Sequence, residues 1–150
     1  MLNMNAGVSK ALATTTLHSD EVEYALLRLP RRAHMAAAGV LADFGDAFSL
    51  VIHARDEITL VLPYEVLDDY RKRLGEVQDF GKPFRLITFD GELDPTLTGF
   101  MAAVSTALAA AGVFIIPLGA FSTDHLLVPA DQFTTAVSAL EKLKTLAKSR

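Results

Sequence analysis

Ser122, Asp124 and His125 are the three residue types of a hydrolytic triad, and they stand close together in the chain. Neighbours in a turn and the strand that follows it point in diverging directions, whereas a triad needs side chains that converge. The pattern around Ser122 also lacks the strand-turn-helix elbow of a nucleophilic serine. Because no general base is paired with a nucleophile, we expect no catalytic residues and a protein that is not an enzyme.

Metal and cofactor motifs are equally weak. Asp90, Glu92 and Asp94 alternate as calcium ligands do, but Gly91 is misplaced for such a loop and no bidentate glutamate follows. The four histidines lack paired spacing, the chain has no cysteine, and no glycine-rich phosphate motif is present. We therefore expect neither a metal nor a cofactor, and a polar turn in which Asp94 or Thr96 caps a helix.

The start of that helix is the most promising binding feature. Free backbone amides and the positive end of the helix dipole at residues 96–99 suit an anion such as the carboxylate of an amino acid. Gly99 would let a ligand approach the backbone closely, or would serve only to pack the helix on a sheet. Both readings remain open.

Residues 95–123 carry no charged side chain, yet they read as several elements. Apolar residues at helical spacing predict a helix over residues 96–111 that ends at Gly112, and a strand over 113–116 follows. A turn at 118–123, a strand at 124–128 and a helix opened by Pro129 complete the pattern. With a strand at 84–89, the order is β-α-β-β-α, and the helix is too rich in small residues to span a membrane.

The N-terminal half repeats this order. We predict a strand at residues 24–29, a short helix at 33–41, a hairpin of strands 48–53 and 58–63, and a helix at 64–74. The fold class is therefore α+β, with two tandem ferredoxin-like (βαββαβ-type) units, antiparallel sheets and helices on one face. We place the units at residues 1–80 and 81–150, with a tight hinge at 75–82.

Each half is one strand short of the complete unit. We expect the segments 12–17 and 84–89 to link the halves, with the first strand of the chain joining one of the two sheets. An ordered N-terminal segment is required for this arrangement.

Composition narrows the class of protein further. A net charge of -4 argues against a nucleic-acid partner, because such proteins need clustered Lys and Arg. The absence of cysteine fits a reducing compartment, and the N-terminal residues lack the apolar core of a secretory signal. We expect a cytoplasmic protein with no membrane partner.

Several short motifs occur in a specific order in the C-terminal third. They are Gly91-Glu92-Leu93-Asp94 before the helix, Thr98-Gly99 in its first turn, Leu108-Ala109-Ala110-Ala111-Gly112 at its end, and Ser122-Thr123-Asp124-His125-Leu126-Leu127-Val128-Pro129. With these motifs residues 90–140 resemble an ACT domain, specifically the ACT units of the CASTOR-type family and its small bacterial relatives. The resemblance implies a regulatory ligand sensor built from two tandem ACT units, the N-terminal one diverged.

In ACT domains that sense amino acids, the ligand lies where two units meet, between the helix-entry loop and the turn between the second and third strands. Carried over by position, the resemblance implies these ligand-binding residues: Asp94, Thr96, Leu97, Thr98, Gly99, Ala120, Phe121, Ser122, Thr123 and Asp124. Asp124 matches the acidic position that contacts arginine in CASTOR-type sensors, and Phe121 matches an aromatic beside it. Leu97 replaces the acidic helix-entry residue, and Gly119-Ala120 replaces a Ser-Thr pair, so a smaller or apolar amino acid fits better than arginine.

We therefore expect a non-catalytic regulatory protein that binds a small ligand, an amino acid, at the interface of ACT units. The ligand carboxylate would lie on the amides near Thr98 and Gly99, and its ammonium near Asp124. The alternative is a structural or protein-partner-binding module with a vestigial pocket. A face of small, uncharged residues on the helix at 96–111 predicts cover by the other unit or by a second copy in a homodimer, and the sequence does not name a regulated protein partner.

Overall fold

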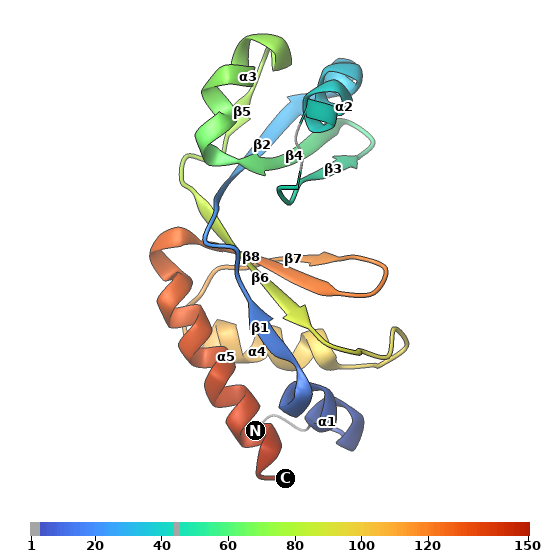
Figure 1. Cartoon of the computed structure of the whole chain (residues 1–150), viewed down its shortest axis with the longest axis vertical. Coiled ribbons are helices and arrows are strands. Elements are labelled where there is room, and N and C mark those ends of the chain that lie inside the picture. The colour runs from blue at the N-terminus through green and yellow to red at the C-terminus, as the bar shows by residue number, and fades with distance from the viewer. Residues whose placement is uncertain (1–3, 44–45) are drawn as a thin grey trace. The chain divides into compact units, whose positions relative to one another are not determined.

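The computed structural model describes residues 4–43 and 46–150, and the chain divides into two compact units (Figure 1). Unit 1 comprises Met1–Asp20 with Arg85–Arg150, and unit 2 comprises Glu21–Phe84. Each unit contains four β-strands and its own helices, so the chain is α+β with two ferredoxin-like units. Residues 4–20 pack with the C-terminal unit, whereas a division at residue 80 would leave them with the N-terminal one.

Unit 2 follows the complete β-α-β-β-α-β order. Its elements are β2 (Glu23–Pro30), α2 (His34–Asp43), β3 (Leu50–His53), β4 (Glu57–Pro63), α3 (Leu67–Leu74) and β5 (Gln78–Asp79), in the strand order β3-β4-β2-β5. The short 3₁₀ turns η1 (Arg31–Ala33) and η2 (Tyr64–Val66) lead into the two helices. The predicted strands and helices of this half are confirmed within a few residues.

Alternation along the strands decides which face of unit 2 becomes the core. Ala25, Leu27 and Leu29 of β2 are almost fully buried, and they pack with the apolar side chains of α2 and α3. The fourth strand, β5, comes from the segment that we expected to be a hinge. It pairs with Leu27 and Arg28, so this segment completes the sheet of unit 2.

The fourth strand of unit 1 comes from the start of the chain. Its elements are α1 (Ala6–Thr14), β1 (Thr16–His18), β6 (Phe84–Asp90), α4 (Phe100–Ala110), β7 (Ile116–Gly119), β8 (Asp124–Pro129), the 3₁₀ turn η3 (Ala130–Gln132) and α5 (Phe133–Lys148). The strand order is β1-β6-β8-β7, and β1 pairs antiparallel with the end of β6. The expectation that the first strand joins a sheet is thus confirmed.

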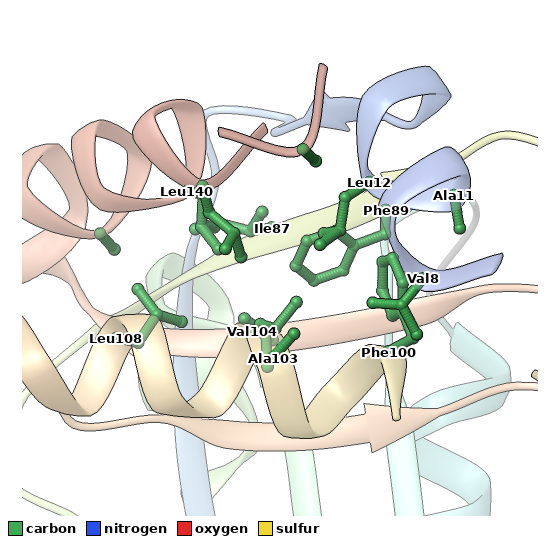
Figure 2. Close-up of a cluster of buried hydrophobic side chains, with 14 of the residues drawn as sticks. Val8, Ala11, Leu12, Ile87, Phe89, Phe100, Ala103, Val104, Leu108 and Leu140 are labelled. Carbon is green, nitrogen blue, oxygen red and sulfur yellow. The ribbon is translucent and has the colours of Figure 1, made fainter. Parts of the chain in front are cut away.

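Three helices cover one face of the unit 1 sheet. Figure 2 shows Val8 and Leu12 of α1 packed against Phe89 of β6 and Phe100 of α4. The rings of Phe89 and Phe100 meet edge to face, with their centroids 5.4 Å apart. Leu140 of α5 joins the same core. Because α1 contributes fully buried side chains, the N-terminal segment is part of the fold of unit 1.

The predicted strand at residues 12–17 is wrong over its first half. Residues 12–14 belong to α1, whose N-cap is Asn5, and only residues 16–18 form a strand. The side chains of Val8, Ala11 and Leu12 lie on one helical face and are buried. Tertiary packing of this face therefore decides the helix.

Two boundaries near α4 also differ from the prediction. The helix begins at Phe100 instead of residue 96, because Gly99 adopts φ 97°, a left-handed conformation that cannot continue a helix backwards. At the other end Gly112 has φ 71°, which confirms the expected glycine cap. The amides of Gly112 and Val113 return to carbonyls of the last helical turn, so the next strand starts only at Ile116. Pro117 is tolerated there because β7 ends the strand order.

Candidate ligand-binding site

One of the four strand-to-helix junctions in the described residues differs from the others. After β2, β4 and β8 the strand ends on a proline, and a three-residue 3₁₀ turn leads directly into the helix. After β6 the chain instead makes a loop of residues 91–99 before α4 begins. The two units thus share a framework, and the extra chain at this junction is available to build a site.

The loop is held in shape by Asp94. Its Oδ1 accepts hydrogen bonds from the Thr96 amide at 2.9 Å and the Thr96 hydroxyl at 2.7 Å, and its backbone carbonyl accepts from the Leu97 amide at 2.9 Å. These bonds from Thr96 stabilise the carboxylate and lower the pKa of Asp94 below its ordinary value. Asp94 therefore caps a turn within the loop. We had expected that Asp94 or Thr96 would cap the helix, but Asp94 does not cap α4.

The turn between β7 and β8 forms the facing wall. The amide of Ala120 donates to the carbonyl oxygen of Thr123 at 2.9 Å, which closes the turn, and Gly119 pairs with Asp124 across the hairpin. A Cβ atom on Gly119 would lie 3.9 Å from Oδ1 of Asp124, so the carboxylate lies beside a residue with no side chain. By strand alternation Asp124 projects from the same face as the buried Leu126, towards the helices.

A cavity of about 110 Å³ lies between the loop and the turn. Seven of the ten predicted site residues line it: Asp94, Leu97, Ala120, Phe121, Ser122, Thr123 and Asp124. Leu93, Pro95 and Phe100 also line it and were not predicted. Phe100 could have been anticipated as the first residue of the helix, had the left-handed conformation of Gly99 been recognised.

Thr96, Thr98 and Gly99 do not line this cavity. Thr96 bonds to Asp94, and the carbonyl oxygen of Thr98 accepts a hydrogen bond from Asn5 at 3.3 Å. A Cβ atom on Gly99 would lie 3.6 Å from Cγ2 of Val8, so Gly99 faces α1. The predicted carboxylate position near Thr98 and Gly99 therefore lies on the α1 side of the loop, apart from the cavity that Asp124 lines.

His125 points to a different set of partners. Its Nδ1 lies 2.8 Å from the hydroxyl oxygen of Thr88 and its Nε2 lies 3.1 Å from that of Thr123. Partial burial lowers the pKa of His125, and the nearby Asp124 carboxylate partly opposes this effect. Both ring nitrogens contact threonine hydroxyls, so His125 links β6 to the β7–β8 turn through Thr88 and Thr123.

The described residues contain no group of three or more His, Asp or Glu side chains that could hold a metal ion. Among them there is also no helix that is both long enough and apolar enough to cross a lipid bilayer.

The sequence profile of the ACT domain matches residues 80–142, a segment that includes the loop, α4 and both strands of the turn. A search of curated proteins finds no significant match to the sequence.

Solved structures match the fold over most of the chain. A protein from Agrobacterium tumefaciens has a TM-score of 0.66 at 21% identity, with 87% of this chain and 89% of that one covered. A Vibrio cholerae protein of unknown function, described as a possible transport protein, has a TM-score of 0.69 at 20% identity and covers 92% and 96%. The regulatory subunit of aspartate kinase from Thermus flavus has a TM-score of 0.67 at 13% identity and covers 86% and 97%. Residues 80–142 therefore match the ACT domain profile, within a chain whose fold is similar to that of these proteins.

Proposed function

We propose that this protein is a non-catalytic regulatory protein that binds an amino acid in the cavity between the β6–α4 loop and the β7–β8 turn. The observation that carries the proposal is the convergence of seven predicted residues on one cavity. Further support comes from the ACT domain match over this segment and from the regulatory subunits of aspartate kinase among proteins of similar fold. We also retain the resemblance to CASTOR-type sensors as part of the proposal.

Complementary charge orients the ligand in the proposed complex. The Asp124 carboxylate lies at one wall of the cavity and would bind the ligand ammonium as a charge-assisted hydrogen bond. Phe100, the first residue of α4, lines the same cavity, and the first amides of a helix have no partner within it. The ligand carboxylate would therefore lie at the start of α4, a few residues beyond the Thr98–Gly99 position predicted from sequence.

The remaining wall favours a small or apolar side chain. Leu97, Phe100 and Phe121 supply hydrocarbon around the cavity, and its second acidic residue, Asp94, already accepts hydrogen bonds from Thr96 through Oδ1. Burying an unpaired guanidinium is costly, so arginine is disfavoured. Phe121 is 97% exposed, which leaves its ring available to close over a bound ligand.

A thermal-shift screen of the common amino acids tests this proposal. A ligand present at a hundredfold excess over its dissociation constant stabilises the native state by about 2.7 kcal/mol if it binds only that state. The variant Asp124→Asn should lose the shift and keep the unliganded melting temperature. Asp131→Asn, which alters an exposed acid in η3 away from the cavity, is the matched control and should keep the shift.

The alternative is a partner-binding module with a vestigial pocket, and the size of the cavity favours it. At about 110 Å³ the cavity is well below the ~300–1,000 Å³ of typical ligand pockets. A screen in which no amino acid raises the melting temperature would support this alternative. A shift that survives Asp124→Asn would instead contradict the proposed orientation of the ligand.

We also propose that the protein is a homodimer. A second copy would cover the uncharged surface of α4. The small residues of that surface are only partly covered within the described chain, because α1 buries Ala103 while Ala102, Ala109 and Ala110 remain exposed.

A further inference from the structure

The outer surface of α4 and α5 has an apolar groove that unit 1 leaves open. It has a volume of about 590 Å³, and small side chains of both helices line it. Lys142 is the one charged residue among those that line it, and α4 has no charged residue along its whole length. Exposed helix faces normally carry charged side chains, so this surface resembles one that is buried in an assembly.

Beside this hollow the same surface carries a projection. Leu146 near the end of α5 is 57% exposed, and it lines the groove together with Ala107, Ala110 and Ala111 of α4 and its C-terminal end. A two-fold contact requires one surface to carry both partners of each contact, because residue i meets residue j and j meets i. A large aliphatic side chain next to a hollow of small residues meets this requirement.

We propose that the α4–α5 groove, defined by the residues that line this hollow, is the surface through which two copies of this chain form a two-fold dimer. Leu146 of each copy enters the hollow beside Ala110 of the other. This inference rests on the homodimer of the proposed function but does not depend on the amino-acid site, which lies at the opposite end of α4.

The available area suits a weak, dissociable contact. α5 has 16 residues and α4 has 11. The longer helix spans about 24 Å and the shorter about 16 Å, and each is roughly 10 Å wide, so each copy offers on the order of 400 Å². The total of about 800 Å² is below the ~1,000 Å² of a stable interface, so we expect a weak dimer that dissociates at accessible protein concentrations.

The polar groups at the surface do not prevent this contact. Lys142 lies at the groove, where its long aliphatic stem can remain against apolar side chains while its ammonium reaches water. Glu141 and Lys144 pair with each other at 3.6 Å on the same helix, and neither lines the groove. A second copy therefore needs to desolvate few charges.

Sedimentation velocity of the full chain without added amino acid, over a range of protein concentrations, tests the inference. We expect a monomer–dimer equilibrium for the wild type and at least a tenfold rise in its dissociation constant for Ala110→Glu and for Leu146→Glu. Ala38→Glu, at an exposed alanine of α2 in unit 2, is the matched control and should dissociate like the wild type. The uncharged variant Leu146→Ala, which removes the projection alone, should also weaken the dimer, and circular dichroism would verify that each variant is folded.

Two results would overturn the inference. One is a wild-type chain that remains monomeric at every concentration, and the other is a dimer whose dissociation constant is unchanged by both groove substitutions. Because these measurements contain no amino acid, they can fail while the thermal-shift screen succeeds, or the reverse.

Discussion

The side chain of Asn5 joins α1 to the loop that enters α4, although 93 positions separate it from its partner. Its Nδ2 donates a hydrogen bond to the carbonyl oxygen of Thr98 at 3.3 Å, and its Oδ1 accepts from the Val8 amide at 2.8 Å. One residue thus caps α1 and holds the far end of the β6–α4 loop. The N-terminal helix therefore acts on the loop that lines the candidate site.

Substitution of Asn5 separates these two contacts. Asn5→Ala removes both and should lower the free energy of unfolding by about 1 kcal/mol, the usual contribution of an N-cap. Asn5→Asp keeps the capping oxygen and loses only the donor to Thr98, so it should cost less. Urea denaturation measures both variants, and equal losses for the two would contradict the capping role.

The core contribution of α1 can be tested at Leu12. This side chain is 1% exposed and packs in the cluster that includes Ile87 and Phe89 (Figure 2). Leu12→Ala should lower the free energy of unfolding by about 2–5 kcal/mol, because it removes buried methyl groups and leaves a cavity. Met35→Ala, at a side chain that is 72% exposed, is the control and should change stability by less than about 0.5 kcal/mol. A small effect at Leu12 would mean that α1 does not pack as described.

The Asp94 turn predicts a pH dependence at the acid end. Hydrogen bonds from Thr96 lower the pKa of Asp94 in the folded protein below its ordinary value of 3.8. The unfolded state therefore takes up a proton first, and the stabilisation, complete above pH 3.8, is lost as the pH falls through the lower folded pKa. Melting temperatures recorded from pH 6 downwards should fall more steeply for the wild type than for Asp94→Asn. Parallel curves would show that the carboxylate contributes nothing.

His125 predicts a second dependence at higher pH. Burial lowers its pKa in the folded protein below 6.5, so the unfolded state binds a proton more readily. The stabilisation is present above pH 6.5 and is lost as the pH falls through the folded pKa. Urea midpoints measured between pH 7.5 and 5 should decline for the wild type and for the control His18→Gln, and decline less for His125→Gln. An unchanged slope in His125→Gln would contradict the assignment.

The order of elements in each half followed from local patterns. Alternating runs such as β4 and the glycine at 112 act within a few residues, so β2, the β3–β4 hairpin and the end of α4 were predicted within a few residues. The loop and turn residues were predicted to bind a ligand on the basis of the ACT resemblance. Seven of them line one cavity, but whether they bind a ligand stays a prediction.

Two of the differences from the prediction depend on contacts between distant segments. A strand of two residues such as β5 carries no periodic signal, and it exists because its backbone pairs with Leu27 and Arg28. Residues 12–14 have a composition that suits a strand or a helix, and burial against Phe89 and Phe100 selects the helix. Gly99 lies in a left-handed conformation next to α1, which places it away from the cavity.

The sequence by itself thus determined the α+β class, the repeated element order and the two chain segments that face each other across the candidate site. The class and the element order arise from spacing and from glycine and proline conformation, which act locally, whereas the two segments were identified through the ACT resemblance. The tertiary structure alone decided that residues 4–20 complete unit 1, and that Phe100 replaces Gly99 in the wall of the cavity. Both outcomes depend on the burial of apolar side chains from segments more than 70 positions apart, for which a single sequence contains no local signal.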